Sequence, residues 1–143
     1  DWGGGIGACP TLTTAQTASR HAPVYAYELL DGDPPFGAYH GWDLPFLWDT
    51  SIPQSQYPDY ADMTPDQQRL SRAMIDYWSA FARHGNPNTP RQPRWMRVHS
   101  RSTSVLGLDS DSIKPTPFAA DHKCEFWSGV QTPDRVSSRP NNG

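Results

Sequence analysis

The distribution of hydrophobic and polar positions predicts a strand early in the chain and an apolar cluster shortly after it. Residues 24–30, VYAYELL, are rich in β-branched and aromatic side chains, and the turn-forming sequence DGDPP follows them, as is typical of a strand. Residues 44–48, LPFLW, form an apolar cluster directly after a polar, glycine-flanked segment at 37–43. We therefore expect a loop that is anchored to a hydrophobic core at its C-terminal end.

A long amphipathic helix is predicted between Thr64 and His84. Thr64 suits the N-cap position because Pro65 follows it and Gln67 stands three residues later, the arrangement of a capping box. The sequence Gly-Asn-Pro at 85–87 ends the helix. Apolar residues at helical spacing are expected to form its buried face, namely Leu70, Met74, Ile75, Trp78, Phe81 and Ala82.

The remaining pattern is weaker and predicts shorter elements. Polar loops flank residues 104–109, so we expect a short strand at the edge of a sheet. Trp95 is expected to hold the connector at 87–93 against the core. The other expected elements are a loop at 1–8, a short helix at 11–21, a loop at 50–62, a terminal helix at 118–130 and a disordered polar tail at 131–143. Residues 1–130 are predicted to form one domain segment.

Composition favours a chain that is part of a larger body. Its 143 residues include 15 prolines and 11 glycines, which indicates many loops, and a hydrophobic content of 36% is low for a self-contained domain. No apolar run approaches the roughly 18 residues of a membrane span, and nothing near Asp1 resembles a targeting signal. The net charge of −3 is spread without a basic stripe, so nucleic acid is not an expected partner.

The two cysteines, Cys9 and Cys124, lie near opposite ends of the chain. Neither has a His or Cys at the spacing of a zinc site, so no metal is expected. A disulfide and two separate buried thiols remain alternatives at this point. A disulfide between them would stabilise the fold by about 4–5 kcal/mol in the chain-entropy model, because it would close a long loop in the unfolded chain. It would also indicate an oxidising compartment.

His40 is the candidate catalytic residue. It lies in the polar segment just before the apolar cluster, and a neutral imidazole, with an ordinary pKa of about 6.5, can accept and return a proton. The sequence GAYHGWDLPF at 37–46 resembles the histidine segment of the type-B carboxylesterases, the group that includes the cholinesterases. The resemblance implies that His40 is the general base of a serine esterase.

Further motifs carry the same resemblance in the same order along the chain. PVYAYEL at 23–29 is similar to the strand that precedes the histidine loop in this family, and residues 70–88 are similar to its pattern LSR…YW..FA..GNPN. Cys9-Pro10 and the sequence CEFW at 124–127 resemble the segments whose cysteines pair in cholinesterases. The resemblance therefore implies a Cys9–Cys124 disulfide, a secreted or extracellular protein, and the C-terminal part of an α/β-hydrolase fold with a central-sheet strand, histidine loop, long amphipathic helix, edge strand and terminal helix.

The other parts of a serine esterase are not found in this sequence. No G-x-S-x-G motif is present, and in this fold the nucleophile and the acid precede the histidine in the chain. We therefore expect both in the remainder of the hydrolase domain, upstream of Asp1, and expect the 143-residue chain to be inactive by itself. For Asp43, three residues after His40, a structural role such as bonding loop amides is expected. The implied substrate is a small carboxylic ester, and no cofactor is expected.

Two alternatives to the esterase are open. The same family fold also serves in non-catalytic adhesion and binding proteins, and the chain by itself would be an inactive truncated fragment with apolar surface exposed on the helix at 64–84. The histidines at 21, 99 and 122 make no metal motif and are expected at the surface. A modest basic patch between residues 91 and 101 is expected to be a solvated loop and not an anion site, namely Arg91, Arg94, Arg97 and Arg101.

Overall fold

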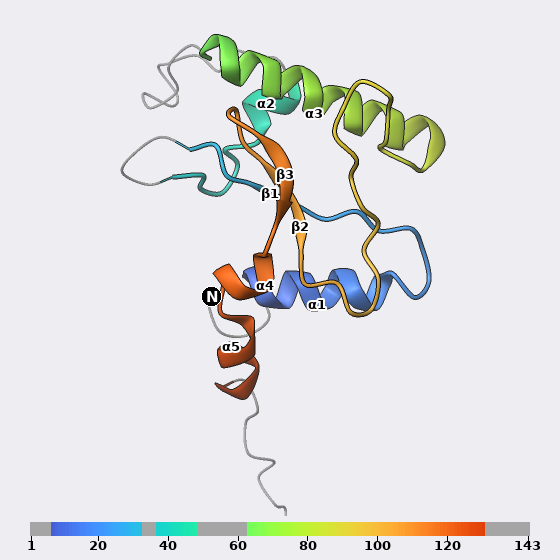
Figure 1. Ribbon diagram of the computed structural model, residues 1–143, viewed down its shortest axis with the longest axis vertical. Helices are drawn as coiled ribbons and strands as arrows, with labels where there is room; N and C mark the ends of the chain where they lie inside the picture. The colour runs from blue at the N-terminus through green and yellow to red at the C-terminus, as the bar shows by residue number, and fades with distance from the viewer. Residues whose placement is uncertain (1–6, 33–36, 49–62, 131–143) are drawn as a thin grey trace, which may run out of the picture.

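A computed structural model describes residues 7–32, 37–48 and 63–130, in which a three-stranded sheet lies between two groups of helices (Figure 1). Its strands are β1 (Tyr27–Leu29), β2 (Val105–Leu108) and β3 (Ile113–Thr116). At one end of the molecule are α2 (Leu44–Trp48) and α3 (Pro65–His84), and at the other are α1 (Ala8–Ala18), α4 (Phe118–Asp121) and α5 (Cys124–Val130). The loop predicted at 50–62 and the tail predicted at 131–143 lie outside the described residues.

The sheet is mixed, with β2 in its centre. β1 pairs with β2 in parallel, placing Tyr27 opposite Leu106, and β2 pairs with β3 in antiparallel fashion. The prediction that the strand at 104–109 is an edge strand is therefore wrong, because it overlooked β3. Because Pro115 has no N–H to donate, the sequence at 113–116 resembled a loop. An outer strand nevertheless tolerates a proline.

Helix α3 begins and ends as predicted. The Thr64 hydroxyl accepts a hydrogen bond from the Gln67 N–H (3.2 Å), and the Gln67 side chain accepts one from the Thr64 N–H (3.0 Å), which completes the capping box. At the other end Gly85 has φ 66°, a left-handed conformation that favours glycine. Both ends are therefore set by local sequence.

The buried face of α3 is only partly the predicted one. Leu70 and Met74 are buried, but Phe81 and Ala82 are exposed. The buried positions also include residues that the apolar pattern left out, namely Ser71, Ala73, Tyr77 and Ala80. Ser71 and the two alanines are small or polar, so a pattern built on large apolar side chains left them out.

Two hydrophobic clusters hold the elements together, one on each side of the sheet. The larger cluster joins α3 to the sheet and the connector, through residues such as Met74, Tyr77, Trp95 and Leu108. Trp95 is buried as predicted, and its indole N–H donates to the Ala26 carbonyl at 2.9 Å. The smaller cluster, Leu12, Val105 and Phe118, joins α1 and α4 to the opposite side.

Both terminal helices differ from their predicted extents. Helix α1 starts at Ala8, inside the segment predicted as a loop, and ends at Ala18. Pro10 is tolerated because the first N–H groups of a helix have no intrahelical partner. The single helix predicted at 118–130 is two helices, since Lys123 between them has φ 54° and interrupts the helical backbone.

Candidate functional site

His40 lies in a tight turn between β1 and α2. The Trp42 N–H donates to the Tyr39 carbonyl at 2.9 Å, which closes a four-residue turn with His40 at its second position. Gly41 follows with φ 84°, a conformation that a residue with a side chain rarely adopts. The His40 side chain is exposed, so its imidazole is accessible to groups outside the described residues.

The residues after this turn fix it to the core. Trp42 and Phe46 are buried, with exposed fractions of 5% and 2%. Within the short helix α2, the Phe46 carbonyl accepts a hydrogen bond from the buried hydroxyl of Ser71 on α3 at 2.7 Å. The predicted apolar anchor is therefore present in part: Pro45 and Phe46 are buried in a helix that packs on α3, whereas Leu44 and Trp48 are exposed.

Asp43 has a structural contact, as expected, but its partner is a side chain of the sheet. The Tyr27 hydroxyl in β1 donates to Asp43 Oδ2 at 2.8 Å. Burial, followed by the hydrogen bond and the charge of Asp43, raises the pKa of Tyr27 well above its ordinary value. Across the described residues, no hydrogen bond joins the Asp43 carboxylate to the His40 imidazole.

The segment before His40 also returns closely against the end of the strand. A Cβ placed on Gly32 would overlap the Ala38 nitrogen and the Gly37 carbonyl carbon, and would lie 2.8 Å from Gly37 Cα. These contacts are with backbone atoms, which no side-chain rotation can relieve. Residue 32 can therefore lie this close to Gly37 and Ala38 only because it has no side chain.

Asp31 organises the carboxyl ends of β1 and β2 and was not identified from the sequence. Its buried carboxylate accepts hydrogen bonds from the Gln67 side chain at 2.9 Å and from the Ser110 N–H at 3.1 Å. One residue thus connects β1, the capping box of α3 and the turn between β2 and β3. Its position just after the predicted strand was the only sequence feature pointing to it.

His122, one of three histidines expected at the surface, is only partly exposed and has a partner that the sequence did not indicate. Its Nε2 lies 2.6 Å from a carboxylate oxygen of Glu28 in β1, and its ring packs on Phe118 with centroids 4.4 Å apart. This pair links the sheet to the region between α4 and α5. His21 and His99 are exposed, as expected. Nothing in the sequence spacing of residues 28 and 122 indicated the contact.

A disulfide joins Cys9 and Cys124, with Cα atoms 5.3 Å apart. It connects the first turn of α1 to the first residue of α5, as the family resemblance implied. The part of the chain with described coordinates contains no cluster of three or more His, Cys, Asp or Glu that could hold a metal ion.

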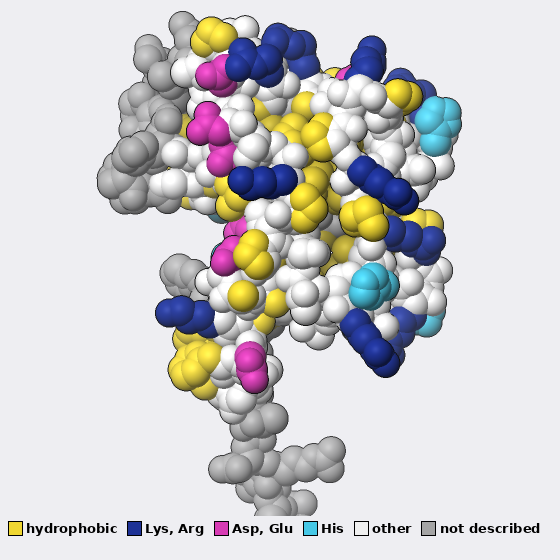
Figure 2. Space-filling view, viewed as in Figure 1, with side chains coloured by type: hydrophobic (Ala, Val, Ile, Leu, Met, Phe, Trp, Pro, Cys, Tyr) yellow, Lys and Arg dark blue, Asp and Glu magenta, His cyan; other side chains and the backbone are white. Residues whose placement is uncertain are grey.

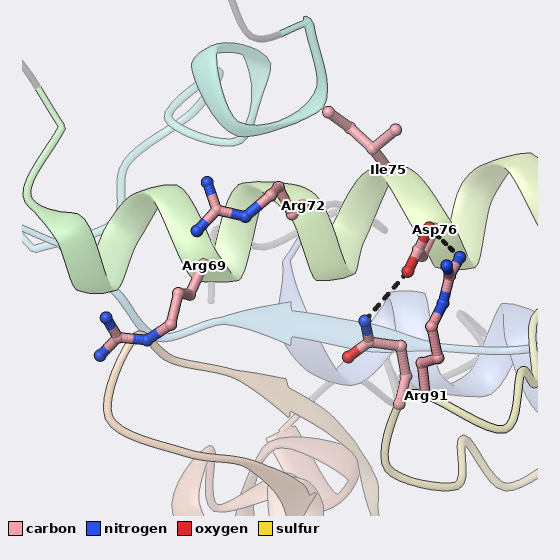
Figure 3. A pocket seen from close by; sticks show the side chains of 6 residues that line it. Arg69, Arg72, Ile75, Asp76 and Arg91 are labelled. Carbon is pink, nitrogen blue, oxygen red and sulfur yellow. Dashed lines mark hydrogen bonds and ion pairs between the residues drawn. The ribbon is translucent and has the colours of Figure 1, made fainter.

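The structure also shows a shallow hollow beside α3 (Figure 3), which is lined by Arg69, Arg72, Ile75, Asp76, Arg91 and Gln92. Asp76 accepts hydrogen bonds from the side chains of Arg91 and Gln92, each at 3.1 Å. All four arginines between residues 91 and 101 are exposed, in agreement with a solvated loop. Among the helices the structure describes, none is both long enough and apolar enough to cross a membrane.

Comparison with known proteins agrees with this architecture. The pattern of the Carboxylesterase family matches residues 5–127. The chain is 34% identical over 132 residues to pyrethroid hydrolase Ces2e of Rattus norvegicus, covering 83% of this chain and 21% of the relative. It is 32% identical over 126 residues to cocaine esterase of Homo sapiens, covering 82% of this chain and 22% of the relative.

Solved structures give the same result. A thermophilic PNB esterase matches with a TM-score of 0.65 and 27% identity, over 80% of this chain and 24% of that structure. A second PNB esterase matches with a TM-score of 0.61 and 25% identity over the same shares of the two chains. The chain thus spans about a fifth to a quarter of the length of the proteins it matches. It belongs to the carboxylesterase family and forms part of an α/β-hydrolase fold.

Proposed function

We propose that the complete protein hydrolyses carboxylic esters and that His40 is the general base of a Ser–Glu/Asp–His triad. The observation that carries the proposal is the position of His40: an exposed imidazole in a turn that follows a parallel strand and is fixed to the core by Trp42 and Phe46. In open α/β sheets, ligands bind beyond the carboxyl ends of the strands. Membership of the carboxylesterase family supports the same role.

The proposed chemistry assigns His40 four proton transfers. Its neutral imidazole takes the proton of the serine hydroxyl as the serine oxygen attacks the ester carbonyl, and the resulting imidazolium then protonates the departing alcohol. An acyl-enzyme remains. His40 next deprotonates a water that attacks this acyl group, and returns the proton to the serine as the carboxylic acid leaves.

We further propose that the serine and the acid belong to a part of the protein that precedes residue 1. Several apolar side chains of the described chain are available for packing against it, including Leu30, Leu44 and Trp48, the last with 69% of its surface exposed. Figure 2 shows hydrophobic surface between the charged groups of one face. In the described sheet β1 pairs with β2 alone, so its other edge is open to a further strand.

The disulfide supports a proposal about location as well. Disulfides persist in oxidising compartments, so we place the complete protein in the secretory pathway or outside the cell. This location is tested by expressing the protein with and without export from the cytosol and titrating the free thiols in each preparation. Free thiols at Cys9 and Cys124 in the exported protein would contradict it.

The esterase proposal is tested by expressing the coding sequence that precedes Asp1 together with the 143-residue chain. Turnover of a short-chain p-nitrophenyl ester is expected in the long form and not in the 143-residue chain, which has no G-x-S-x-G motif. A G-x-S-x-G sequence upstream is also expected. A different residue at that serine, together with no turnover in the long form, would instead support a non-catalytic binding protein of this fold.

A further inference from the structure

We propose that Tyr27 is a positioning residue for His40, and that it acts through its hydrogen bond to Asp43. The observation behind the proposal is the 2.8 Å contact between the Tyr27 hydroxyl in β1 and Asp43 Oδ2 in the histidine segment. The inference rests on the proposed general-base role of His40. It adds a residue of the sheet that determines where the imidazole lies.

Tyr27 is fixed at both its backbone and its ring. Its backbone is part of the parallel pairing with β2, opposite Leu106. Its ring meets Trp78 of α3 edge to face, with centroids 5.0 Å apart, and meets Trp95 of the connector in the same way at 6.1 Å. Edge-to-face pairs of this kind restrict the orientation of the ring. The hydroxyl at its end is therefore a fixed point of the core.

Asp43 transmits this fixed position to the turn. Its backbone carbonyl accepts a hydrogen bond from the Leu47 N–H at 3.1 Å, in the first turn of α2, while its side chain is held by Tyr27. Only Gly41 and Trp42 separate Asp43 from His40. Because the Tyr39–Trp42 hydrogen bond makes this a compact turn, a shift of Asp43 moves the backbone of His40.

The chemistry of Tyr27 and Asp43 favours a hydrogen bond that persists. A phenol that donates to a carboxylate makes a charge-assisted hydrogen bond, which is stronger than one between neutral groups. The raised pKa of Tyr27 keeps the phenol protonated through neutral and mildly alkaline pH. Tyr27 therefore remains a donor wherever the imidazole is active as a base.

Tyr25 provides a matched control two residues earlier in the chain. Like Tyr27 it is partly buried, and its ring also packs edge to face on Trp95, at 6.1 Å. Its hydroxyl donates to Asn86 at 3.4 Å, just beyond the end of α3. Removing this hydroxyl changes a tyrosine of the same environment without touching the histidine segment.

The test is Tyr27→Phe in the complete enzyme, beside Tyr25→Phe and His40→Ala, with kcat and KM measured for p-nitrophenyl acetate. Misplacing a catalytic group by about 1 Å can cost about 100-fold in rate, so we expect Tyr27→Phe to lower kcat by about 10- to 100-fold. KM should stay within about twofold of the parent value, because the Tyr27–Asp43 hydrogen bond orients the base and does not bind the substrate. Tyr25→Phe should keep the parent kcat.

Variants of Asp43 provide a second arm that does not depend on the folding of Tyr27→Phe. Asp43→Asn keeps an acceptor for the phenol and should retain more turnover than Asp43→Ala. Asp43→Ala combined with Tyr27→Phe should be no slower than the slower of the two single variants, because both remove one interaction. Equal rates for Asp43→Asn and Asp43→Ala would overturn the proposal.

The outcomes separate this inference from the proposal on which it rests. Full kcat in Tyr27→Phe, with His40→Ala inactive, would overturn the positioning role alone. Equal losses in Tyr27→Phe and Tyr25→Phe would also overturn it, since the effect would then be a general loss of packing. Turnover that survives His40→Ala would overturn the general-base role itself.

Discussion

Gly32→Ala is expected to impair catalysis by displacing the histidine segment. The added methyl group would overlap the Ala38 nitrogen and the Gly37 carbonyl carbon, and ordinary contact with Gly37 Cα requires that atom to move from 2.8 Å to at least 3.4 Å. The overlapping atoms must move further, so we expect a backbone shift of about 1 Å, enough to lower kcat by about 100-fold. Overpacking of this kind also costs about 1–3 kcal/mol of stability.

The assay for Gly32→Ala is ester turnover by the complete protein, measured together with its thermal midpoint. Gly129→Ala in α5 is the matched control, because a Cβ there meets no atom within 4 Å and alanine is the better helix former. The control should keep kcat and should keep or slightly raise the midpoint. If Gly32→Ala kept the parent kcat as well, the close return of the loop against the strand would not be what places His40.

Four further predictions concern stability. Met74→Ala, at a fully buried position, should lower the free energy of unfolding by about 2–5 kcal/mol in urea denaturation. Thr64→Ala should remove the capping box and cost about 1 kcal/mol, with faster amide exchange in the first turn of α3 as the local readout. Replacing both Cys9 and Cys124 by Ser should cost up to about 5 kcal/mol in the chain-entropy model, and reductant should then leave the variant's unfolding midpoint unchanged. Burial raises the pKa of Tyr77 to about 12. The neutral phenol therefore stabilises the fold fully below pH 10, and this contribution is lost as the pH rises towards 12. Tyr77→Phe should show a smaller fall in the free energy of unfolding over that pH range.

Elements with local determinants were predictable from the sequence. The capping box and Gly85 fixed both ends of α3 at the predicted residues, and the apolar run at 44–48 indicated an anchor that the structure shows to be buried at Phe46. The existence of β1 followed from its β-branched and aromatic residues. In each case the determining residues are neighbours in the chain.

Features that depend on distant contacts were not predictable in this way. The place of β2 in the sheet depends on its pairing with β3, which the proline at position 115 made look like a loop. The buried face of α3 includes Ser71, Ala73 and Ala80, which a pattern of large apolar residues does not mark. The contacts of Asp43 with Tyr27 and of His122 with Glu28 join residues 16 and 94 positions apart. A single sequence contains no spacing rule for such pairs.

The central claim is that His40 is the base of an ester hydrolase, and its most direct test is the turnover of the complete protein with His40→Ala. His21→Ala, at another exposed histidine, is the control. Loss of a triad histidine can lower kcat by about 10⁶-fold, so His40→Ala should be nearly inactive with a short-chain p-nitrophenyl ester while the control keeps the parent rate. A His40→Ala protein that kept most of its turnover would contradict the account.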